Sequence, residues 1–196
     1  MRVIGLTGNF GTGKTTVSQM LAELGATIID ADKLGHELLQ PDTETYREIL
    51  AAFGRSILKP NGEIDRNKLG KLVFADAASL NRLNQIMHPK IYEIAKRKIE
   101  EYLKTDTKII VLEAALLIEA DWAPLIDQAW ITTAPEATIV RRLKSGRGLK
   151  EEQVLARLRN QMSPEEKAKR ADVVIDTDCY LDELRTKVTE LWHNLL

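Results

Sequence analysis

The chain has 196 residues, of which 44% are hydrophobic and 29% charged, and its formal net charge is −1. Such values are typical of a globular domain, leave too little length for two full domains, and argue against a surface devoted to nucleic acid. A single cysteine, Cys179, excludes an internal disulfide and a cysteine-based zinc site.

No apolar run approaches the roughly 18 residues of a membrane span. The chain enters a predicted strand at Arg2 without an apolar leader. We therefore expect a cytoplasmic protein with no membrane or nucleic-acid partner, present as a monomer or a weak homo-oligomer.

Five short apolar segments are predicted strands, and helical patterns separate them. Segments that are apolar on both faces indicate a parallel sheet covered by helices on both sides. The expected fold class is α/β, with three layers around a parallel five-stranded sheet. The predicted strands are Arg2–Thr7, Ala26–Ile29, Lys108–Leu112, Gln128–Thr132 and Ala171–Ile175.

Helices are predicted from apolar residues at helical spacing. The first begins after a glycine-rich stretch and is expected to end at a Gly25 cap. In the long pattern from Ser79 to Leu103, Pro89 either kinks the helix or marks a helix start. Further helices are expected at Pro135–Lys144 and about Leu181–Leu195.

Two all-helical stretches, about 33–103 and 141–170, interrupt the alternation of strands and helices. No repeat or low-complexity linker separates them from the rest. We therefore expect a single domain, 1–196, with a helical substrate-binding insertion at about 33–103 and a helical lid at about 141–170.

The glycine-rich stretch, residues 8–16, reads Gly-Asn-Phe-Gly-Thr-Gly-Lys-Thr-Thr and follows the first strand. Its glycines let the backbone aim N–H groups at phosphates, and the following helix adds its positive end. Lys14 can reach the β- and γ-phosphate oxygens, and the Thr15 hydroxyl can ligate Mg²⁺. The sequence predicts a site for a nucleoside triphosphate.

Several classes of protein use such a loop. A GTPase needs N-K-x-D, and Asn67–Gly70 lacks the aspartate. An AAA-type ATPase places acidic residues after an apolar strand, which Ile109–Glu113 loosely fits, but the chain is too short for that module. A small-molecule kinase remains, with a non-catalytic nucleotide switch as the alternative from another class.

A basic stretch supports the kinase interpretation. Between Arg141 and Arg170 there are ten basic and four acidic residues, many of which a solvated helical face would explain. Arg141, Arg142 and Arg147 surround a predicted turn at Ser145–Gly146, where guanidinium groups could stabilise a transferring phosphoryl group. A glycine at the tip would let this lid move.

Two aspartates end the second predicted strand, at the carboxyl edge where open α/β sheets bind ligands. Asp32 is the candidate for accepting the proton of an acceptor hydroxyl. Either Asp30 or Asp32 could instead cap the following helix, and the role of Asp30 stays open.

These residues, in this order, resemble the dephospho-CoA kinase family over nearly the whole chain. The phosphate loop alone indicates only a superfamily, whereas the ordered set is far more specific. The motifs that carry the resemblance are residues 4–16, Ile29–Asp32, Ile64–Leu69 followed by Val73–Phe74, His88–Pro89, Leu116–Leu117 before Glu119, Arg141 to Arg147, Arg157 with Gln161, and Ala171–Ile175.

The resemblance implies a P-loop kinase that phosphorylates the 3′-hydroxyl of dephospho-CoA with Mg·ATP, the last step of coenzyme A synthesis. It implies catalytic roles for Asp32, Lys14 and Arg141, and a magnesium contact for Thr15. The implied ATP contacts are Gly11, Thr12, Gly13, Lys14, Thr15, Thr16 and Arg147, and the implied acceptor contacts are Asp32, Asp65, Arg66 and His88.

The chain departs from the family pattern in three places. A proline usual before Leu116–Leu117 is missing, and the lid spacing leaves either Lys144 or Arg147 as the second lid cation. Asp176–Asp178 replaces the usual residues near the adenine, so base contacts would run through backbone or Thr177. The nearest rivals are kinases of nucleoside monophosphates or shikimate.

Overall fold

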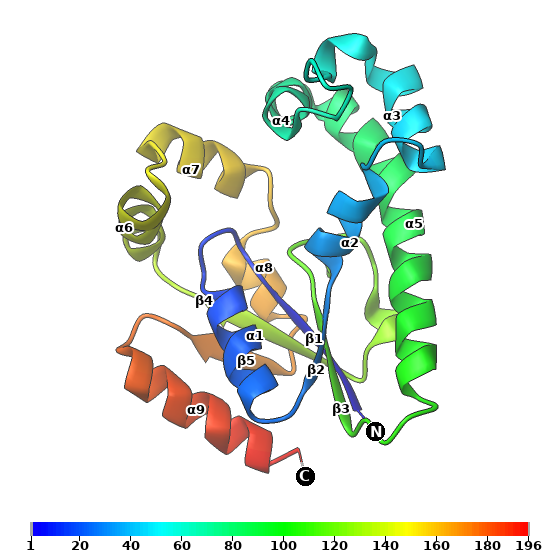
Figure 1. Ribbon diagram of the computed structural model, residues 1–196. Coiled ribbons are helices and arrows are strands. Elements are labelled where there is room, and N and C mark those ends of the chain that lie inside the picture. Colours follow the sequence, from blue (N-terminus) through cyan, green and yellow to red (C-terminus); the bar gives the residue numbers. More distant parts are fainter. Residues whose placement is uncertain (1, 196) are drawn as a thin grey trace. The chain divides into compact units, whose positions relative to one another are not determined.

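The computed structural model describes residues 2–195, which form two compact units (Figure 1). The first unit combines the chain up to Asp30 with the chain from Lys98 onward. The second unit is the continuous segment Ala31–Arg97. The phosphate loop and the basic stretch both belong to the first unit.

The first unit is built on a five-stranded sheet in the order β2-β3-β1-β4-β5, and all of its pairs are parallel. This confirms the predicted α/β class and the parallel five-stranded sheet. Each predicted strand is present, and each of its ends lies within two residues of the predicted position. The strands are β1 Arg2–Gly8, β2 Thr27–Asp30, β3 Ile109–Glu113, β4 Gln128–Thr133 and β5 Val173–Asp176.

Two aspartates that precede strands explain where those strands begin. The Val3 N–H donates to Asp127 Oδ2 at 2.7 Å, and the Ala129 N–H donates to Asp172 Oδ2 at 2.7 Å. The carboxylates thus occupy backbone donors that would otherwise need a strand partner. Asp172, expected inside the last strand, therefore lies just before β5.

One face of the sheet is covered by α1 (Lys14–Glu23) and α9 (Leu181–His193). Apolar residues of both helices pack with alternate residues of the strands, such as Ile4 and Leu6, into one buried cluster. Gly5 faces the opposite side of the sheet, where the side chains of Leu117 and Ile126 lie closest to Gly5. In the sequence these two residues precede and follow the short η2 (Ala123–Leu125).

Gly25 follows α1 with φ of 109°, and the Ala26 N–H donates to the Leu21 carbonyl at 2.9 Å. This left-handed glycine cap ends the helix as predicted.

The basic stretch forms α6 (Glu136–Arg147), α7 (Glu151–Arg159) and α8 (Pro164–Ala168). Ile139, Leu143 and Val154 form a small core that joins α6 to α7. The expected turn at Ser145–Gly146 is wrong, because α6 continues to Arg147. The chain turns at Gly148, which has φ of 62° and a conformation that glycine adopts without steric cost.

The second unit is helical, and α5 runs beyond it into the first. The bounds are α2 Ala31–Leu38, α3 Glu44–Phe53, η1 Arg55–Ile57, α4 Arg66–Ala75 and α5 Ala77–Tyr102. Pro89 lies inside α5, so it does not mark a helix start. In the part of the chain that the structure describes, no helix has both the length and the apolar character that a membrane span requires.

Candidate active site

The phosphate loop joins β1 to α1, and its glycines adopt backbone angles that other residues rarely take. Gly11 has φ of 83° and Gly13 has φ of 87°. A Cβ added at Gly11 would lie 2.7 Å from Leu143 Cδ1, so the loop also packs closely against α6. Glycine is required at this position by both conformation and space.

Thr12 holds the loop together from inside. Its side chain is buried, and Oγ1 lies 2.8 Å from both the Asn9 carbonyl oxygen and Thr132 Oγ1. The Thr12 N–H also donates to the Asn9 carbonyl, at 3.2 Å. Any contact between Thr12 and a nucleotide therefore has to come from its backbone, after the N–H leaves Asn9.

Lys14 begins α1 and folds back over the loop. Its Nζ donates to the Gly8 carbonyl at 2.9 Å and lies 3.4 Å from the Asn9 carbonyl. Thr15 and Thr16 occupy the same first turn of α1, with Thr15 exposed. An ammonium, a hydroxyl and a helix N-terminus thus converge on one place.

Glu113 is a residue that the sequence reasoning did not assign to the site. It ends β3, is 8% exposed, and accepts a hydrogen bond from Thr15 Oγ1 at 3.1 Å. Asp30 ends the neighbouring strand β2 in register with Glu113. Two carboxyl groups therefore end adjacent strands, and one of them, that of Glu113, accepts from the Thr15 hydroxyl.

The surroundings of Glu113 oppose its ionisation. Burial is the main cause that raises the pKa of its carboxyl above the usual 4.5, and the charge of Asp30 adds to the rise. Hydrogen bonds from Ser18 and Thr15, and then the charge of Lys14, pull the pKa the other way. A cation placed beside Thr15 would relieve this cost, since it would stabilise the ionised carboxylate.

The oxygen donors here fit magnesium. Mg²⁺ prefers carboxylate, hydroxyl and phosphate oxygens, and commonly binds through one or two protein groups together with substrate phosphates. Among residues 2–195, no group of three or more His, Cys, Asp or Glu side chains could hold a metal alone. Thr15 and Glu113 therefore suit an ion that arrives with a nucleotide.

Arg142, expected to face a phosphoryl group, instead supports the loop. Its Nη1 donates to Thr177 Oγ1 at 3.0 Å and its Nη2 to the Thr177 carbonyl at 2.6 Å. Thr177 is buried, and its hydroxyl donates to the carbonyl of Thr12 at 2.9 Å or of Thr133 at 3.1 Å. With its hydroxyl engaged in this way, the Thr177 side chain is poorly placed to read a base.

Arg141 and Arg147 lie on the exposed side of α6. Arg141 Nη2 is 3.4 Å from Thr138 Oγ1, which in turn donates to Asp178 Oδ1 at 2.9 Å. The Arg147 guanidinium lies 5.7 Å from the centre of the Phe10 ring, within the range of a cation–π contact. Arg147 is thus held next to the phosphate loop.

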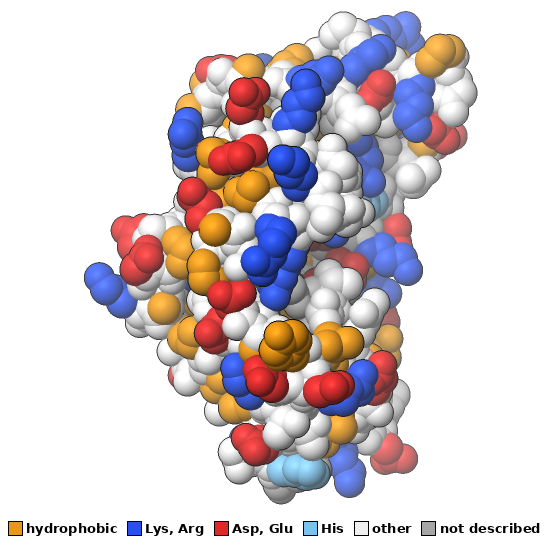
Figure 2. Space-filling model, turned by 90° about the vertical axis from the view of Figure 1, so that its left-hand side faces the viewer, with side chains coloured by type: hydrophobic (Ala, Val, Ile, Leu, Met, Phe, Trp, Pro, Cys, Tyr) orange, Lys and Arg blue, Asp and Glu red, His pale blue; other side chains and the backbone are white. Residues whose placement is uncertain are grey.

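The basic stretch does not form a continuous basic surface. On the face that Figure 2 presents, Lys and Arg side chains are interspersed with Asp and Glu rather than forming one basic area. This mixture agrees with the net charge of −1. Anion binding would therefore depend on individual arginines and not on the overall charge of the surface.

The predicted acceptor contacts all belong to the second unit. Asp32 lies exposed in the first turn of α2. Asp65 caps α4, with Oδ1 accepting from the N–H of Asn67 at 3.0 Å and Lys68 at 3.2 Å, while Arg66 begins α4 and is exposed. One oxygen of Asp65 is thereby occupied by a structural role.

His88 is partly buried within α5, and it is not among the residues that line a cavity of the second unit. The cavity has a volume of about 450 Å³ and is lined by residues of α3 and α5, among them Pro89 and Lys90. Lys90 pairs with Glu48 across the two helices, with 2.9 Å between Nζ and Oε1. This is a concave surface adjacent to the His-Pro motif.

Comparisons with known proteins decide the family. The dephospho-CoA kinase family model matches residues 2–183. The chain belongs to the dephospho-CoA kinase family. Dephospho-CoA kinases of Geobacter sulfurreducens and Dehalococcoides mccartyi are 43% and 42% identical to it, over 98% and 96% of this chain and 98% and 94% of theirs.

Solved structures agree with this family assignment. A crystal structure of TT1252 from Thermus thermophilus has a TM-score of 0.82 at 31% identity, covering 100% of this chain and 98% of that one. The dephospho-CoA kinase of Campylobacter jejuni has a TM-score of 0.71 at 26% identity, covering 98% and 96%. A shikimate kinase of Acinetobacter baumannii, at 18% identity and a TM-score of 0.55, shares the fold.

Proposed function

We propose that the protein transfers the γ-phosphoryl group of ATP to the 3′-hydroxyl of dephospho-CoA, giving CoA and ADP. The observation that carries this proposal is a phosphate loop whose Lys14 and Thr15 lie beside the Glu113 carboxylate of β3, in a chain that the family model matches from residue 2 to 183. Dephospho-CoA and ATP are the proposed partners.

ATP binding is proposed for the loop residues Gly11 to Thr16. Their backbone N–H groups and Lys14 would surround the phosphates, and Thr15 with Glu113 would hold Mg²⁺. The bound ion would neutralise charge on the β- and γ-phosphate oxygens. The support is the hydrogen bond from Thr15 Oγ1 to Glu113 Oε1, which brings a hydroxyl and a carboxylate oxygen to within 3.1 Å of each other.

Proton transfer is proposed for Asp32. Its carboxylate would accept the proton of the acceptor hydroxyl while that oxygen bonds to the γ-phosphorus and the bond to the β–γ bridging oxygen breaks. Support comes from its exposure in the first turn of α2, just beyond the carboxyl end of β2.

The lid role is proposed for residues 141–170, with Arg141 and Arg147 stabilising the transferring group. Between the two candidates for the second cation, the structure supports Arg147, because its guanidinium is held beside Phe10 of the loop. Lys144 is exposed on α6. A cytoplasmic location and a monomeric or weakly oligomeric state complete the proposal.

Acceptor binding is proposed for the helical segment of about 33–103, through Asp65, Arg66 and His88. The support is the cavity of about 450 Å³ in the same helical unit, which Pro89 of the His-Pro motif lines while His88 itself does not. Arg66 would provide a cation for a phosphate of the acceptor.

The experiment is direct. Purified protein is incubated with Mg·ATP and dephospho-CoA, and the products are identified by mass; we expect CoA and one ADP for each CoA. Parallel reactions contain shikimate or a nucleoside monophosphate. Faster phosphorylation of either would reject dephospho-CoA as the substrate, and slow ATP hydrolysis without any phosphorylated acceptor would favour the nucleotide switch.

Asp32→Asn tests the proposed base. Without a carboxylate to accept the proton, kcat should fall by about 10²–10⁴-fold. ATP affinity, measured by calorimetry, should stay within about twofold, since the phosphate loop is untouched. A variant with near wild-type turnover on dephospho-CoA would show that Asp32 is not the base.

A further inference from the structure

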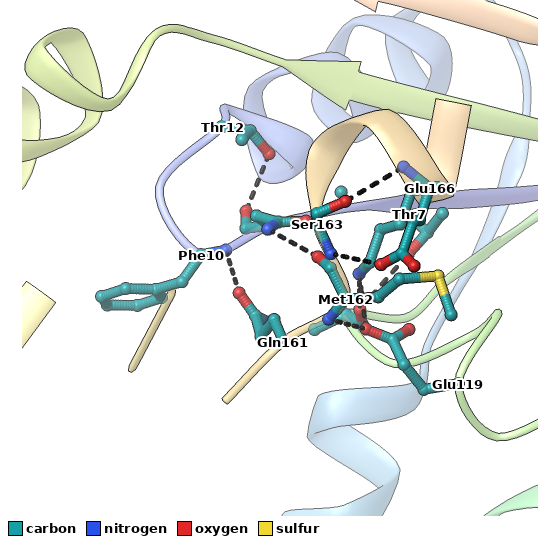
Figure 3. Close-up of polar contacts among 12 residues, drawn as sticks. Thr7, Phe10, Thr12, Glu119, Gln161, Met162, Ser163 and Glu166 are labelled. Atoms are coloured by element: carbon teal, nitrogen blue, oxygen red, sulfur yellow. Dashed lines mark hydrogen bonds and ion pairs between the residues drawn. The ribbon is translucent and has the colours of Figure 1, made fainter. Parts of the chain in front are cut away.

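The apex of the phosphate loop is fastened by a residue far along the chain. The Phe10 N–H donates to Gln161 Oε1 at 2.8 Å, and Asn9 Nδ2 donates to the Met162 carbonyl at 3.1 Å (Figure 3). Gln161 and Met162 lie between α7 and α8, so the segment that returns from α7 contacts the loop at two successive residues.

The returning segment is fixed in turn by an ion pair whose lysine is completely buried. Lys167 of α8 is 0% exposed, and its Nζ lies 2.9 Å from Glu119 Oε1 and 3.0 Å from the Ala115 carbonyl. The same Glu119 oxygen accepts from the Met162 N–H at 3.2 Å, a contact visible in Figure 3. Glu119 Oε2 is buried without a hydrogen-bond partner among the described residues.

We propose that Gln161 is a positioning residue of the phosphate loop, and that the Lys167–Glu119 pair holds Gln161 in place through Met162. Gln161 occupies the N–H of Phe10, which lies just outside the stretch Gly11–Thr16 proposed to bind the phosphates. Because this hydrogen bond fixes the backbone at Phe10, the N–H groups of Gly11–Thr16 are ordered before ATP binds. Less conformational entropy is then lost on binding.

The Phe10 side chain reinforces this arrangement. Its ring lies 4.8 Å from the Arg157 guanidinium and 5.7 Å from that of Arg147. Arg157 belongs to α7 and Arg147 to α6, so the apex touches both helices as well as the segment after them. A shift of Gln161 would therefore displace Phe10, and with it the contacts of the loop with both arginines.

The inference rests on the proposed function only in naming ATP, and amide hydrogen exchange of the ligand-free protein tests it separately. Gln161→Met removes the acceptor and keeps the length of the side chain. We expect the Phe10 amide to exchange about tenfold faster. The KM for ATP should rise about fivefold, as for one lost hydrogen bond, with kcat and the KM for the acceptor within about twofold.

Gln153→Met is the matched control. Gln153 Oε1 accepts from the Lys150 N–H at 3.0 Å, which is the same kind of contact at the start of α7. This variant should leave Phe10 exchange and the KM for ATP unchanged. If Gln161 instead competes with the phosphates for the Phe10 N–H, Gln161→Met will bind ATP more tightly, and that result would overturn the proposal.

The ion pair needs a variant that folds. Lys167→Met alone leaves the partly buried Glu119 carboxylate without its cation, whereas the double variant Glu119→Leu with Lys167→Met removes both charges, which proteins often tolerate. We expect the double variant to melt within a few degrees of wild type yet to show the faster Phe10 exchange and raised KM of Gln161→Met. Wild-type values for both measurements would mean that the pair serves the fold alone.

Failure of this inference is distinguishable from failure of the proposed function. If no acceptor is phosphorylated, the proposed function is wrong, yet Phe10 exchange and calorimetric ATP binding still test Gln161. If CoA is formed while Gln161→Met exchanges and binds ATP like wild type, the positioning role alone is wrong.

Discussion

Glu113 carries a carboxyl group in surroundings that disfavour its charge. Burial and the nearby Asp30 both raise its pKa above 4.5. Such a group destabilises the ligand-free protein when it ionises and gains a favourable partner when a cation binds. Carboxyl groups with pKa values perturbed in this way are common at functional sites.

Glu113→Gln should change how stability depends on pH. With its pKa raised, the folded state binds more protons than the unfolded chain, so stability falls as pH rises from about 4.5 through the raised value. The amide does not ionise, and Gln can still accept from Thr15. Melting temperatures of the ligand-free variant should therefore lack this decline and exceed wild type above that window.

The control for this experiment is Glu190→Gln, an exposed glutamate of α9. It should retain the wild-type decline, measured by calorimetry between about pH 4 and pH 8. Parallel pH profiles for wild type and Glu113→Gln would contradict the stated effect of burial.

Lys14→Ala should damage binding and turnover together. In the ligand-free protein Lys14 donates to the carbonyls of Gly8 and Asn9, and we expect it to exchange these contacts for phosphate oxygens when a nucleotide binds. We expect kcat/KM for ATP to fall by about a hundredfold or more, through both constants. Unchanged ATP binding in calorimetry would exclude Lys14 from the phosphate site.

At the scale of elements, α6 continues through Gly146, where the sequence predicts a turn. Gly146 lies inside α6 with no atom within 4 Å of the place where a Cβ would be, whereas Gly148 ends the helix with φ of 62°. The chain therefore turns at Gly148 and not at Gly146. Two neighbouring glycines thus have opposite requirements.

Gly146→Ala and Gly148→Ala form a matched pair. The first substitution should stabilise the protein by about 0.5–1 kcal/mol, since alanine favours the helix and lowers the entropy of the unfolded chain. The second should destabilise it by about 1 kcal/mol, since alanine resists the left-handed conformation. Melting temperatures test both, and equal shifts in one direction would contradict the structure.

The whole molecule divides the proposed substrates between its two units. Hydrogen exchange can test this, because a bound ligand slows exchange where it contacts or orders the backbone. An ATP analogue with Mg²⁺ should protect residues 8–16 and parts of 141–170. Dephospho-CoA should protect segments within 31–97, and protection by dephospho-CoA confined to the first unit would contradict the acceptor role of the helices.

The sequence predicted the sheet and the phosphate loop because their signals are local. An apolar run such as Ile109–Leu112 and the glycine spacing of residues 8–13 need no knowledge of distant residues. Glu113 has a local signal too, because it is a charge that ends an otherwise apolar strand, but that pattern is also typical of AAA-type ATPases and does not by itself indicate a kinase site.

Other parts of the site depend on contacts between distant residues. Lys167 follows two glutamates in a short polar helix and looks solvated, yet it is completely buried against Glu119. Arg142 resembled a phosphate ligand, but Thr177, 35 residues later, uses its guanidinium. Side-chain partners across such separations leave no periodic pattern in one sequence.

The position of β1 in the sheet affects how the protein is made. β1 pairs with β3 and β4, which follow it by roughly a hundred residues or more. At about 5–20 residues per second on the ribosome, the nucleotide loop waits several seconds or longer for the strands that support it. Segment 31–97 is synthesised before then, so the helical unit can begin to fold while the strands that complete the sheet of the first unit are still missing.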